Sequence, residues 1–312
     1  MRIAVTGGAG FIGSHFIEKL IEKDFSVVVV DNLITGKLEN INKYIKSGKV
    51  KFIEKDVQDF IEIEGEIDTV VHLASIASPK AYSEHPVNTL KSGSLGTINS
   101  LGLAKAKKAK YLLASTSEVY GNPLISPQKE SYWGNVNPVG PRSMYDESKR
   151  FAEASAFTYM NEFGLDVKIA RIFNTYGTRM QINDGRVVTN FVYQALTGKD
   201  ITIYGDGTQT RSLSYVSDTV EYLFRLMNSD FQGVMNIGNP DEIQMIDLAN
   251  KIMKKTDSVS KIKFLELPQD DPEQRKPDIN LAIKELQYKP MVSLEDGLVM
   301  LINWVRERVA SK

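Results

Sequence analysis

The sequence contains no cysteine and only three histidines among its 312 residues. Without cysteine, the chain has no disulfide bond, no thiol nucleophile and no zinc–thiolate centre. The histidines, His15, His72 and His85, are not spaced as metal ligands, so we expect structural roles for them and no metal site. A Ser/His/Asp arrangement for nucleophilic catalysis is not evident either.

An excess of charge of one sign and long hydrophobic runs are also lacking. The formal net charge is −1, which gives no reason to expect nucleic acid or an anionic membrane as a partner. No apolar run reaches the roughly 18 residues of a membrane-spanning helix, and the first apolar residues lead into a glycine loop. We therefore expect a soluble, cytoplasmic protein with a large core, because 42% of the residues are hydrophobic.

Short β-branched runs alternate with helical stretches over the first part of the chain. The strand candidates cover residues 2–6, 26–31, 51–56, 68–74, 110–115 and 166–172, and the main helical patterns cover residues 11–23, 85–108 and 143–163. The runs are apolar almost throughout, which is typical of parallel strands buried on both faces. The pattern predicts an α/β fold, a doubly wound parallel sheet of the Rossmann type, over residues 1–175.

The pattern of alternating strands and helices ends at about residue 175. Turn-rich segments such as NDGR and YGDGTQTR appear, followed by helical stretches near residues 217–228 and 246–255. We expect residues 176–312 to form mainly a smaller substrate-binding lobe, with some segments returning to the main sheet. This lobe would cover the carboxyl edge of the sheet, where such folds bind ligands.

A glycine-rich turn, TGGAGFIG, follows the first strand and precedes a helix. Gly7, Gly10 and Gly13 would allow a tight turn and a close approach of the backbone to a pyrophosphate. Asp31 ends the second strand, eighteen residues after Gly13, where a carboxylate accepts from both ribose hydroxyls and repels a 2′-phosphate. The pattern favours NAD over NADP; a strand-capping aspartate beside a tight turn is the simpler alternative.

Three hydroxyl side chains and a carboxylate, residues 115–118, end the fifth strand candidate. Downstream, Tyr145 and Lys149 are four residues apart and lie on one face of the expected helix. A positive charge at about 4 Å supplies roughly 4 kcal/mol, enough to lower the pKa of Tyr145 by about 3 units. The pair is therefore a candidate for proton transfer, although a surface Tyr/Lys pair is common on helices.

Together these residues resemble the extended short-chain dehydrogenase/reductase superfamily, whose members act on sugars attached to nucleoside diphosphates. Within it, the sequence is most similar to the UDP-glucuronate decarboxylase family, also called UDP-xylose synthases. The resemblance covers nearly the whole chain, through VDNLITGK, HLASIASP, LLASTSEVYG, YWGNVNPVGPRSMYDESKR, ARIFNTYG, NDGRVVTNF, YGDGTQTRSLSYVSD, NIGNP and QDDPEQRKPDI. Two positions depart from the family pattern: Gly93 stands where Asn is usual, and Thr178 where Pro is frequent.

The resemblance implies an active site, a nucleotide-sugar site and a resident NAD. The catalytic residues implied are Tyr145, Lys149, Glu118, Thr116, Ser117 and Arg275, with Ser115 as an alternative to Thr116. The substrate contacts implied are Lys91, Asn99, Asn174, Arg186, Tyr204, Arg211 and Arg275. The cofactor contacts implied are Gly7, Gly10, Phe11, Ile12, Gly13, Asp31, Asn32, Thr35, Gly36, Asp56, Val57, Leu73, Ser75, Ser92, Tyr145 and Lys149.

The reaction implied is oxidation at C4 of the sugar, loss of CO2 from the 4-keto acid, protonation at C5 and re-reduction at C4. Glu118 would position a water or relay a proton near C5, or else be a salt-bridged strand-end acid. An oxidative decarboxylase that releases a UDP-4-keto-pentose, a 4-epimerase, a 4,6-dehydratase and a non-catalytic NAD-sensing scaffold are the alternatives. The superfamily also implies a homodimer through a four-helix bundle built from residues 85–108 and 143–163.

Overall fold

The computed structural model describes residues 1–182, 184–267 and 274–310. Asn183 of the NDGR turn and residues 269–273 of the QDDPEQRKPDI stretch therefore lie outside the described residues. Within the described part of the chain, no helix is both long and apolar enough to cross a membrane.

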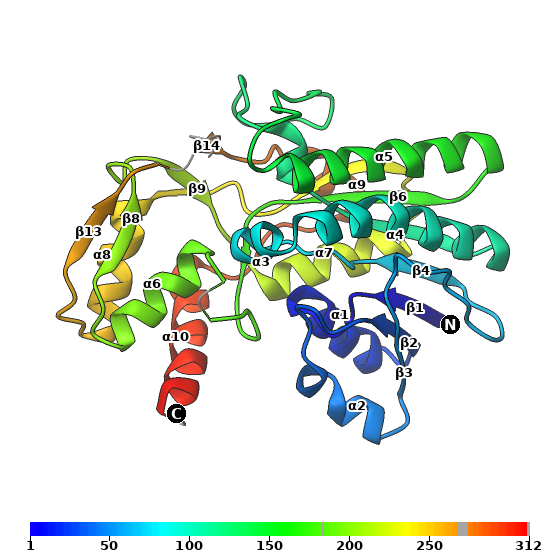
Figure 1. The fold of residues 1–312 in the computed structure, drawn as a ribbon, viewed down its shortest axis with the longest axis horizontal. Helices are drawn as coiled ribbons and strands as arrows, with labels where there is room; N and C mark the ends of the chain where they lie inside the picture. The colour runs from blue at the N-terminus through cyan, green and yellow to red at the C-terminus, as the bar shows by residue number, and fades with distance from the viewer. Residues whose placement is uncertain (183, 268–273, 311–312) are drawn as a thin grey trace.

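A parallel seven-stranded sheet forms the centre of the molecule (Figure 1). Its strands are ordered β11-β6-β5-β4-β1-β2-β3. Their bounds are β1 Arg2–Thr6, β2 Ser26–Asp31, β3 Val50–Glu54, β4 Thr69–His72, β5 Lys110–Thr116, β6 Val167–Ile172 and β11 Gly233–Ile237.

Helices cover both faces of this sheet. The helices α1 (Phe11–Glu22), α7 (Val216–Asn228) and α9 (Asn280–Leu286) pack on one face, and α4 (Pro86–Lys107) and α5 (Ser143–Phe163) pack on the other. The short helix α2 (Asn42–Lys46) precedes β3. Alternation along β1 explains the two layers, because Ile3 and Val5 belong to the core beneath α1, whereas Ala4 belongs to the core beneath α4 and α5. All three side chains are fully buried, as strands covered on both faces require.

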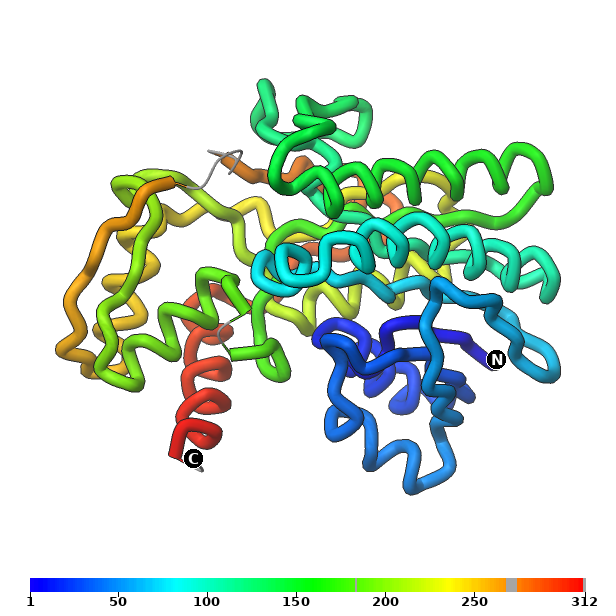
Figure 2. Tube along the Cα trace, viewed as in Figure 1, coloured from blue at the N-terminus to red at the C-terminus, as the bar shows by residue number. Residues whose placement is uncertain are grey.

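The α/β doubly wound fold predicted from the sequence is confirmed. The predicted bounds of β1, β2 and α5 agree with the structure, and those of the other six helices and strands predicted in this part differ by at most two residues. The sequence pattern did not identify β11, which lies beyond residue 175 yet pairs in parallel with β6. In Figure 2 the yellow part of the chain leads from β11 out to the second lobe, and the orange part after residue 274 returns to the sheet with α9 (Asn280–Leu286).

The remaining elements gather at one side of the sheet, on the left in Figure 1. They include three helices, α6 (Val187–Leu196), α8 (Met245–Thr256) and α10 (Leu294–Ala310). Three small sheets accompany them in the described part of the chain. The first contains β12 (Glu242–Gln244), β9 (Thr210–Ser212) and β14 (Gln274–Arg275). The second contains β13 (Ile262–Leu265) and β8 (Ile201–Tyr204), and the third contains β10 (Ser214–Tyr215) and β7 (Thr175–Tyr176).

Candidate active site

The glycine turn after β1 is packed so tightly that only glycine fits. Gly7 has φ 71°, in the left-handed region, and a Cβ there would lie 2.6 Å from the Ala74 nitrogen. A Cβ on Gly13 would lie 2.2 Å from the carbonyl oxygen of Gly7. The first turn of α1 therefore starts directly against the ends of β1 and β4, which leaves backbone N–H groups at a helix N-terminus for a phosphate.

Asp31 ends β2 beside this turn and is only 7% exposed. Its carboxylate accepts hydrogen bonds from the Ala9 nitrogen at 2.9 Å and the Leu33 nitrogen at 2.8 Å. Burial raises the pKa of Asp31, and these two hydrogen bonds act in the opposite direction. A Cβ on Gly36 would lie 3.0 Å from the carboxylate, so glycine there keeps the space beside Asp31 open.

A cavity of about 840 Å³ runs from the glycine turn to the second lobe. Most of the residues implied by the resemblance line it. They are Gly7, Gly10, Phe11, Ile12, Gly13, Asp31, Asn32, Thr35, Gly36, Val57, Leu73, Ser75, Ser92, Ser115, Thr116, Ser117, Glu118, Tyr145, Lys149, Asn174, Arg186, Tyr204, Arg211 and Arg275. The glycine turn and the open space beside a buried carboxylate fit the pyrophosphate and ribose of NAD.

Three of the implied residues lie outside the described wall of this cavity. Lys91 is exposed on α4, and Asp56 accepts a hydrogen bond from the Asn32 side chain at 2.8 Å. The Asn99 amide donates to the carbonyls of residues 57–59 at 2.9 to 3.0 Å. Asn99 therefore fixes the loop that carries Val57, and we do not assign it or Lys91 to the substrate. Asp56 instead holds the side chain of Asn32, which lines the cavity.

Tyr145 and Lys149 lie on one face of α5, at the carboxyl ends of β4 and β5. Burial raises the pKa of Tyr145, and its hydrogen bond with Thr116 acts against this rise. The Lys149 ammonium donates to the Ala114 carbonyl at 2.8 Å, and burial lowers the pKa of Lys149 to about 8. The lowered pKa expected for Tyr145 is therefore not found, because desolvation outweighs the hydrogen bond with Thr116.

The three hydroxyls at the end of β5 have different surroundings. Thr116 bonds Tyr145 and also accepts from the backbone nitrogen of Glu118 at 3.3 Å. Ser115 instead donates to the Glu153 carboxylate at 2.5 Å. Ser117 is buried and lines the cavity beside them. Of the two hydroxyls that could serve C4, Thr116 is therefore the one that contacts Tyr145.

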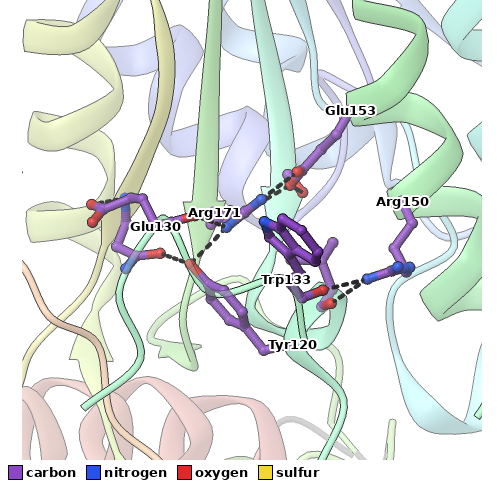
Figure 3. Close-up of polar contacts among 9 residues, drawn as sticks. Tyr120, Glu130, Trp133, Arg150, Glu153 and Arg171 are labelled. Atoms are coloured by element: carbon purple, nitrogen blue, oxygen red, sulfur yellow. Dashed lines mark hydrogen bonds and ion pairs between the residues drawn. The ribbon is translucent and has the colours of Figure 1, made fainter. Parts of the chain in front are cut away.

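Glu153 joins Ser115 to a buried polar network, drawn in Figure 3. Arg171 lies between Glu153, which it contacts at 2.7 and 3.0 Å, and the Tyr120 hydroxyl, which it contacts at 2.8 Å. Tyr120 in turn donates to the Asn236 side chain at 2.7 Å. The network connects β5, α5, β6 and β11 with the short helix η2 (Ser117–Tyr120), which carries Glu118 as well as Tyr120.

Glu118 is buried between two arginines. Its Oε2 pairs with Arg142 and accepts from Arg275 at 2.8 Å. Arg142 caps the start of α5, three residues before Tyr145, and Arg275 lies on β14. Asp146 is 3.9 Å from Arg142, and burial, together with the nearby Glu118 charge, raises the pKa of Asp146 to about 7.

Arg142 was not singled out from the sequence, although a signal was present. It precedes Tyr145 by one helical turn, and residues three apart on a helix share a face. Tyr82, on α3 (Pro79–Glu84), was also missed; its ring stacks on that of Tyr145 at 5.5 Å between centroids. The Arg142 guanidinium lies 6.0 Å from the centre of the same Tyr82 ring.

Side chains from the segment after β6 and from α6 with its preceding turn complete the cavity wall. The Asn174 amide nitrogen is buried and, within the described residues, has no hydrogen-bond partner, and the same holds for the side-chain oxygen of Asn190 on α6. Arg186 pairs with Asp184 and lies 5.4 Å from the Phe11 ring. Buried polar atoms without a partner are costly, so the two asparagines fit a wall that binds a polar ligand.

The chain matches the model of the family described as GDP-mannose 4,6 dehydratase over residues 4–301. It is 49% identical over 308 residues to UDP-glucuronic acid decarboxylase 1 of Xenopus tropicalis, covering 99% of this chain and 73% of the relative. It is 52% identical over 302 residues to UDP-glucuronic acid decarboxylase 3 of Arabidopsis thaliana, covering 96% of this chain and 88% of the relative.

Solved structures show the same architecture. The UDP-glucose 4-epimerase of Thermotoga maritima with UDP-glucose superposes with a TM-score of 0.90 at 29% identity, covering 99% of this chain and 100% of the epimerase. The UDP-glucuronic acid 4-epimerase of Bacillus cereus, solved with UDP-glucuronic acid and NAD, superposes with a TM-score of 0.88 at 28% identity, covering 99% and 100%.

Proposed function

The chain belongs to the GDP-mannose 4,6-dehydratase family and, within it, to the UDP-glucuronic acid decarboxylases, and from this membership we propose that it converts UDP-glucuronate to UDP-xylose and CO2 with NAD as its cofactor. The observation that carries the proposal is the pairing of buried Glu118 with Arg275 beside Tyr145. A pure 4-epimerase needs the C4 chemistry of Tyr145, but it needs no charged pair for C5.

The chemistry of decarboxylation explains why the site needs both Tyr145, for the reaction at C4, and the Glu118–Arg275 pair, for the reaction at C5. Direct loss of CO2 from the C5 carboxylate would leave an unstabilised carbanion. When bound at the glycine turn and Asp31, NAD would supply a two-electron acceptor for oxidation at C4 and a two-electron donor for the re-reduction. With a ketone at C4 the sugar is a β-keto acid, and the charge left by CO2 spreads onto the ketone oxygen. One proton is consumed at C5 for each CO2 released.

Tyr145 and Thr116 serve C4. Tyr145 takes the proton of the C4 hydroxyl and returns it to the same oxygen at re-reduction. Thr116, which bonds Tyr145, donates to the C4 oxygen while the enolate charge rests there. The Lys149 ammonium, four residues along α5, favours the deprotonated form of Tyr145 when the site is filled.

Glu118, Arg275 and Arg142 serve C5. A guanidinium binds a carboxylate through two parallel hydrogen bonds, so Arg275 suits the uronate carboxylate before CO2 leaves. Glu118 holds both guanidiniums through one oxygen and orders the water or proton relay to C5. Asn174, Arg186 and Arg211 would hold the two phosphates, and Tyr204, which is 47% exposed, would lie against the uracil.

One incubation tests this function. The purified protein is incubated with UDP-glucuronate and no added NAD, and the product is identified by NMR. UDP-xylose is the expected product. A keto-pentose with reduced cofactor indicates the oxidative variant, UDP-galacturonate indicates an epimerase, and unchanged substrate indicates a sensor; each of these three results would overturn the proposal.

We also propose a cytoplasmic homodimer through a four-helix bundle. The helices α4 and α5 pack side by side, and they expose Val87, Leu90, Leu95 and Phe151 by 46 to 61%. An apolar face across two adjacent helices suits pairing with the same face of a second copy, which would give four helices. Light scattering should give a dimer for the wild type and a monomer for Leu90→Asp; a monomeric wild type would contradict the bundle.

A further inference from the structure

The loop that follows β7 returns to α1 and contacts it through Arg179. One nitrogen of the guanidinium pairs with the Glu18 carboxylate, and another donates to the Ser14 carbonyl at 3.1 Å. Arg179 has φ 63°, a left-handed conformation that residues other than glycine rarely adopt. Such conformations persist where the surrounding contacts determine them, and they gather at functional sites.

Two further contacts accompany this ion pair. The Gln181 amide nitrogen donates to the Thr35 carbonyl at 2.7 Å, and His15 Nε2 donates to the Thr178 carbonyl at 2.9 Å. Thr178 is one of the positions at which the sequence departs from the family pattern. We call Thr178, Arg179 and Gln181, with their partners His15, Glu18 and Thr35, the clasp.

Glu18 anchors the clasp from outside the cavity. Besides Arg179, it accepts from Lys43 at 2.8 Å and from the Tyr44 hydroxyl at 2.6 Å, both on α2. Burial acts to raise the pKa of Glu18, but the hydrogen bonds from Lys43, Tyr44 and Arg179 lower it to about 2. Glu18 is therefore ionised at neutral pH and is held by three donors.

The clasp joins two walls of the cavity beside Asp31. Arg179 and Gln181 line the cavity from one side, and Asp31 and Thr35 line it from the side of the glycine turn. Glu18 is not among the residues of the described chain that line it. Among the described side-chain partners of Glu18, which are Lys43, Tyr44 and Arg179, Arg179 is the one that lines the cavity.

We propose that the clasp retains NAD, so that its contacts must break before the dinucleotide can leave. This inference rests on the proposed function, because it takes NAD as the ligand of the glycine turn and Asp31. The proposed reaction leaves NAD in its starting oxidation state after each turnover, so the enzyme has no need to exchange it. Contacts between the two walls, such as that of Gln181 with the Thr35 carbonyl, suit such retention because they hold the walls together beside Asp31.

The test measures NAD release directly. The holoenzyme is loaded with isotopically labelled NAD and diluted into an excess of unlabelled NAD, and the label retained on the protein is followed with time. Glu18→Gln removes the charge that holds Arg179 and should speed release by about tenfold, the usual effect of losing one charge-assisted contact. Arg179→Gln should speed release equally, and the double variant no further, because both changes break one contact.

Glu295→Gln is the matched control. Glu295 also accepts from two cations, Lys251 at 2.8 Å and Lys255 at 2.6 Å, but it lies on α10, away from the cavity wall. Equal release from Glu18→Gln and wild type, or fast release from Glu295→Gln, would overturn the clasp. Fast release from Arg179→Gln alone would also overturn it, since Arg179 would then act by touching NAD. A wild type that binds no NAD would instead overturn the proposed cofactor itself.

Discussion

Replacing Glu118 by Gln should stop decarboxylation while leaving oxidation at C4 intact. The substitution keeps the shape of the side chain and removes the charge that pairs with Arg142 and Arg275. Both guanidiniums are at most 16% exposed, so water replaces the lost partner poorly. Hydrogen bonds to charged groups contribute about 1.5–3 kcal/mol each, and we expect a loss of about 2–4 kcal/mol in the free energy of unfolding. A domain of ordinary stability still folds after this loss.

The effect on the reaction differs between the two steps. A misplacement of about 1 Å costs on the order of 100-fold in rate, so loosening Arg275 should slow decarboxylation by about 100- to 1000-fold. The Glu118 charge is one of the causes that raise the pKa of Tyr145, after burial. Removing it therefore lowers the pKa of Tyr145, and proton removal from C4 should be as easy as before or easier.

The assay follows both steps in a single turnover. On mixing with UDP-glucuronate, Glu118→Gln should accumulate reduced nicotinamide, seen by its near-ultraviolet absorbance, while release of labelled CO2 stays slow. Glu147→Gln is the control, because Glu147 is a half-buried acid on α5 that pairs only with Arg150 at 3.6 Å among the pairs described. Wild-type CO2 release by Glu118→Gln, or a failure to reduce the cofactor, would refute the division of roles.

Three other predictions follow from buried charges. Because burial lowers the pKa of Lys149 to about 8, the pH–rate profile should fall as the pH rises through about 8, and a rate that keeps rising above that pH would exclude a role for the ammonium. The raised pKa of Asp146, about 7, means that its ionisation disfavours the folded state, so stability should fall as the pH rises from about 4 to about 7. In urea unfolding, Asp146→Asn should therefore gain stability relative to the wild type as the pH rises from about 4 to about 8. A difference in stability between the two proteins that stays the same over this pH range would contradict the prediction. Glu153→Ala leaves Arg171 buried without its partner and should lower the free energy of unfolding by about 3–5 kcal/mol, against less than about 1 kcal/mol for Glu295→Ala in an exposed pair. A loss below about 1 kcal/mol for Glu153→Ala would show that the Figure 3 network is not stabilising.

The sheet and the dinucleotide end were predictable because their signals are local. The run Val27–Val30 is apolar throughout, and burial on both faces of a parallel sheet is the usual reason for such a run. The glycines of TGGAGFIG are close in sequence, and the crowding of Gly13 against the Gly7 carbonyl follows from the turn itself. By contrast, the pairing of β11 with β6 joins segments more than sixty residues apart, and no local pattern specifies it.

Several side-chain contacts could not be predicted because the partners are remote in the sequence. The Asn99 amide nitrogen donates to three carbonyls of residues 57–59, about forty positions away, and no local pattern indicates these contacts. Ser115 and Thr116 are neighbours on one strand, and such neighbours point to opposite faces. Which of them meets Tyr145 depends on where α5 packs, and the sequence alone does not fix this.

The C5 pair depends on contacts of the same remote kind. Arg275 pairs in register with Arg211 of β9, and the next residue, Lys276, exchanges two hydrogen bonds of 2.8 Å with Gln128. Asn236 of β11 then donates to the Gln128 carbonyl at 3.0 Å. Arg275 therefore reaches Glu118 only when the second lobe, the segment after η2 and the edge of the sheet are all assembled. The glycine turn of the cofactor end is encoded locally, whereas the contact of Arg275 with Glu118 depends on segments from the whole fold. A substitution far from the cavity can therefore impair decarboxylation and spare NAD binding.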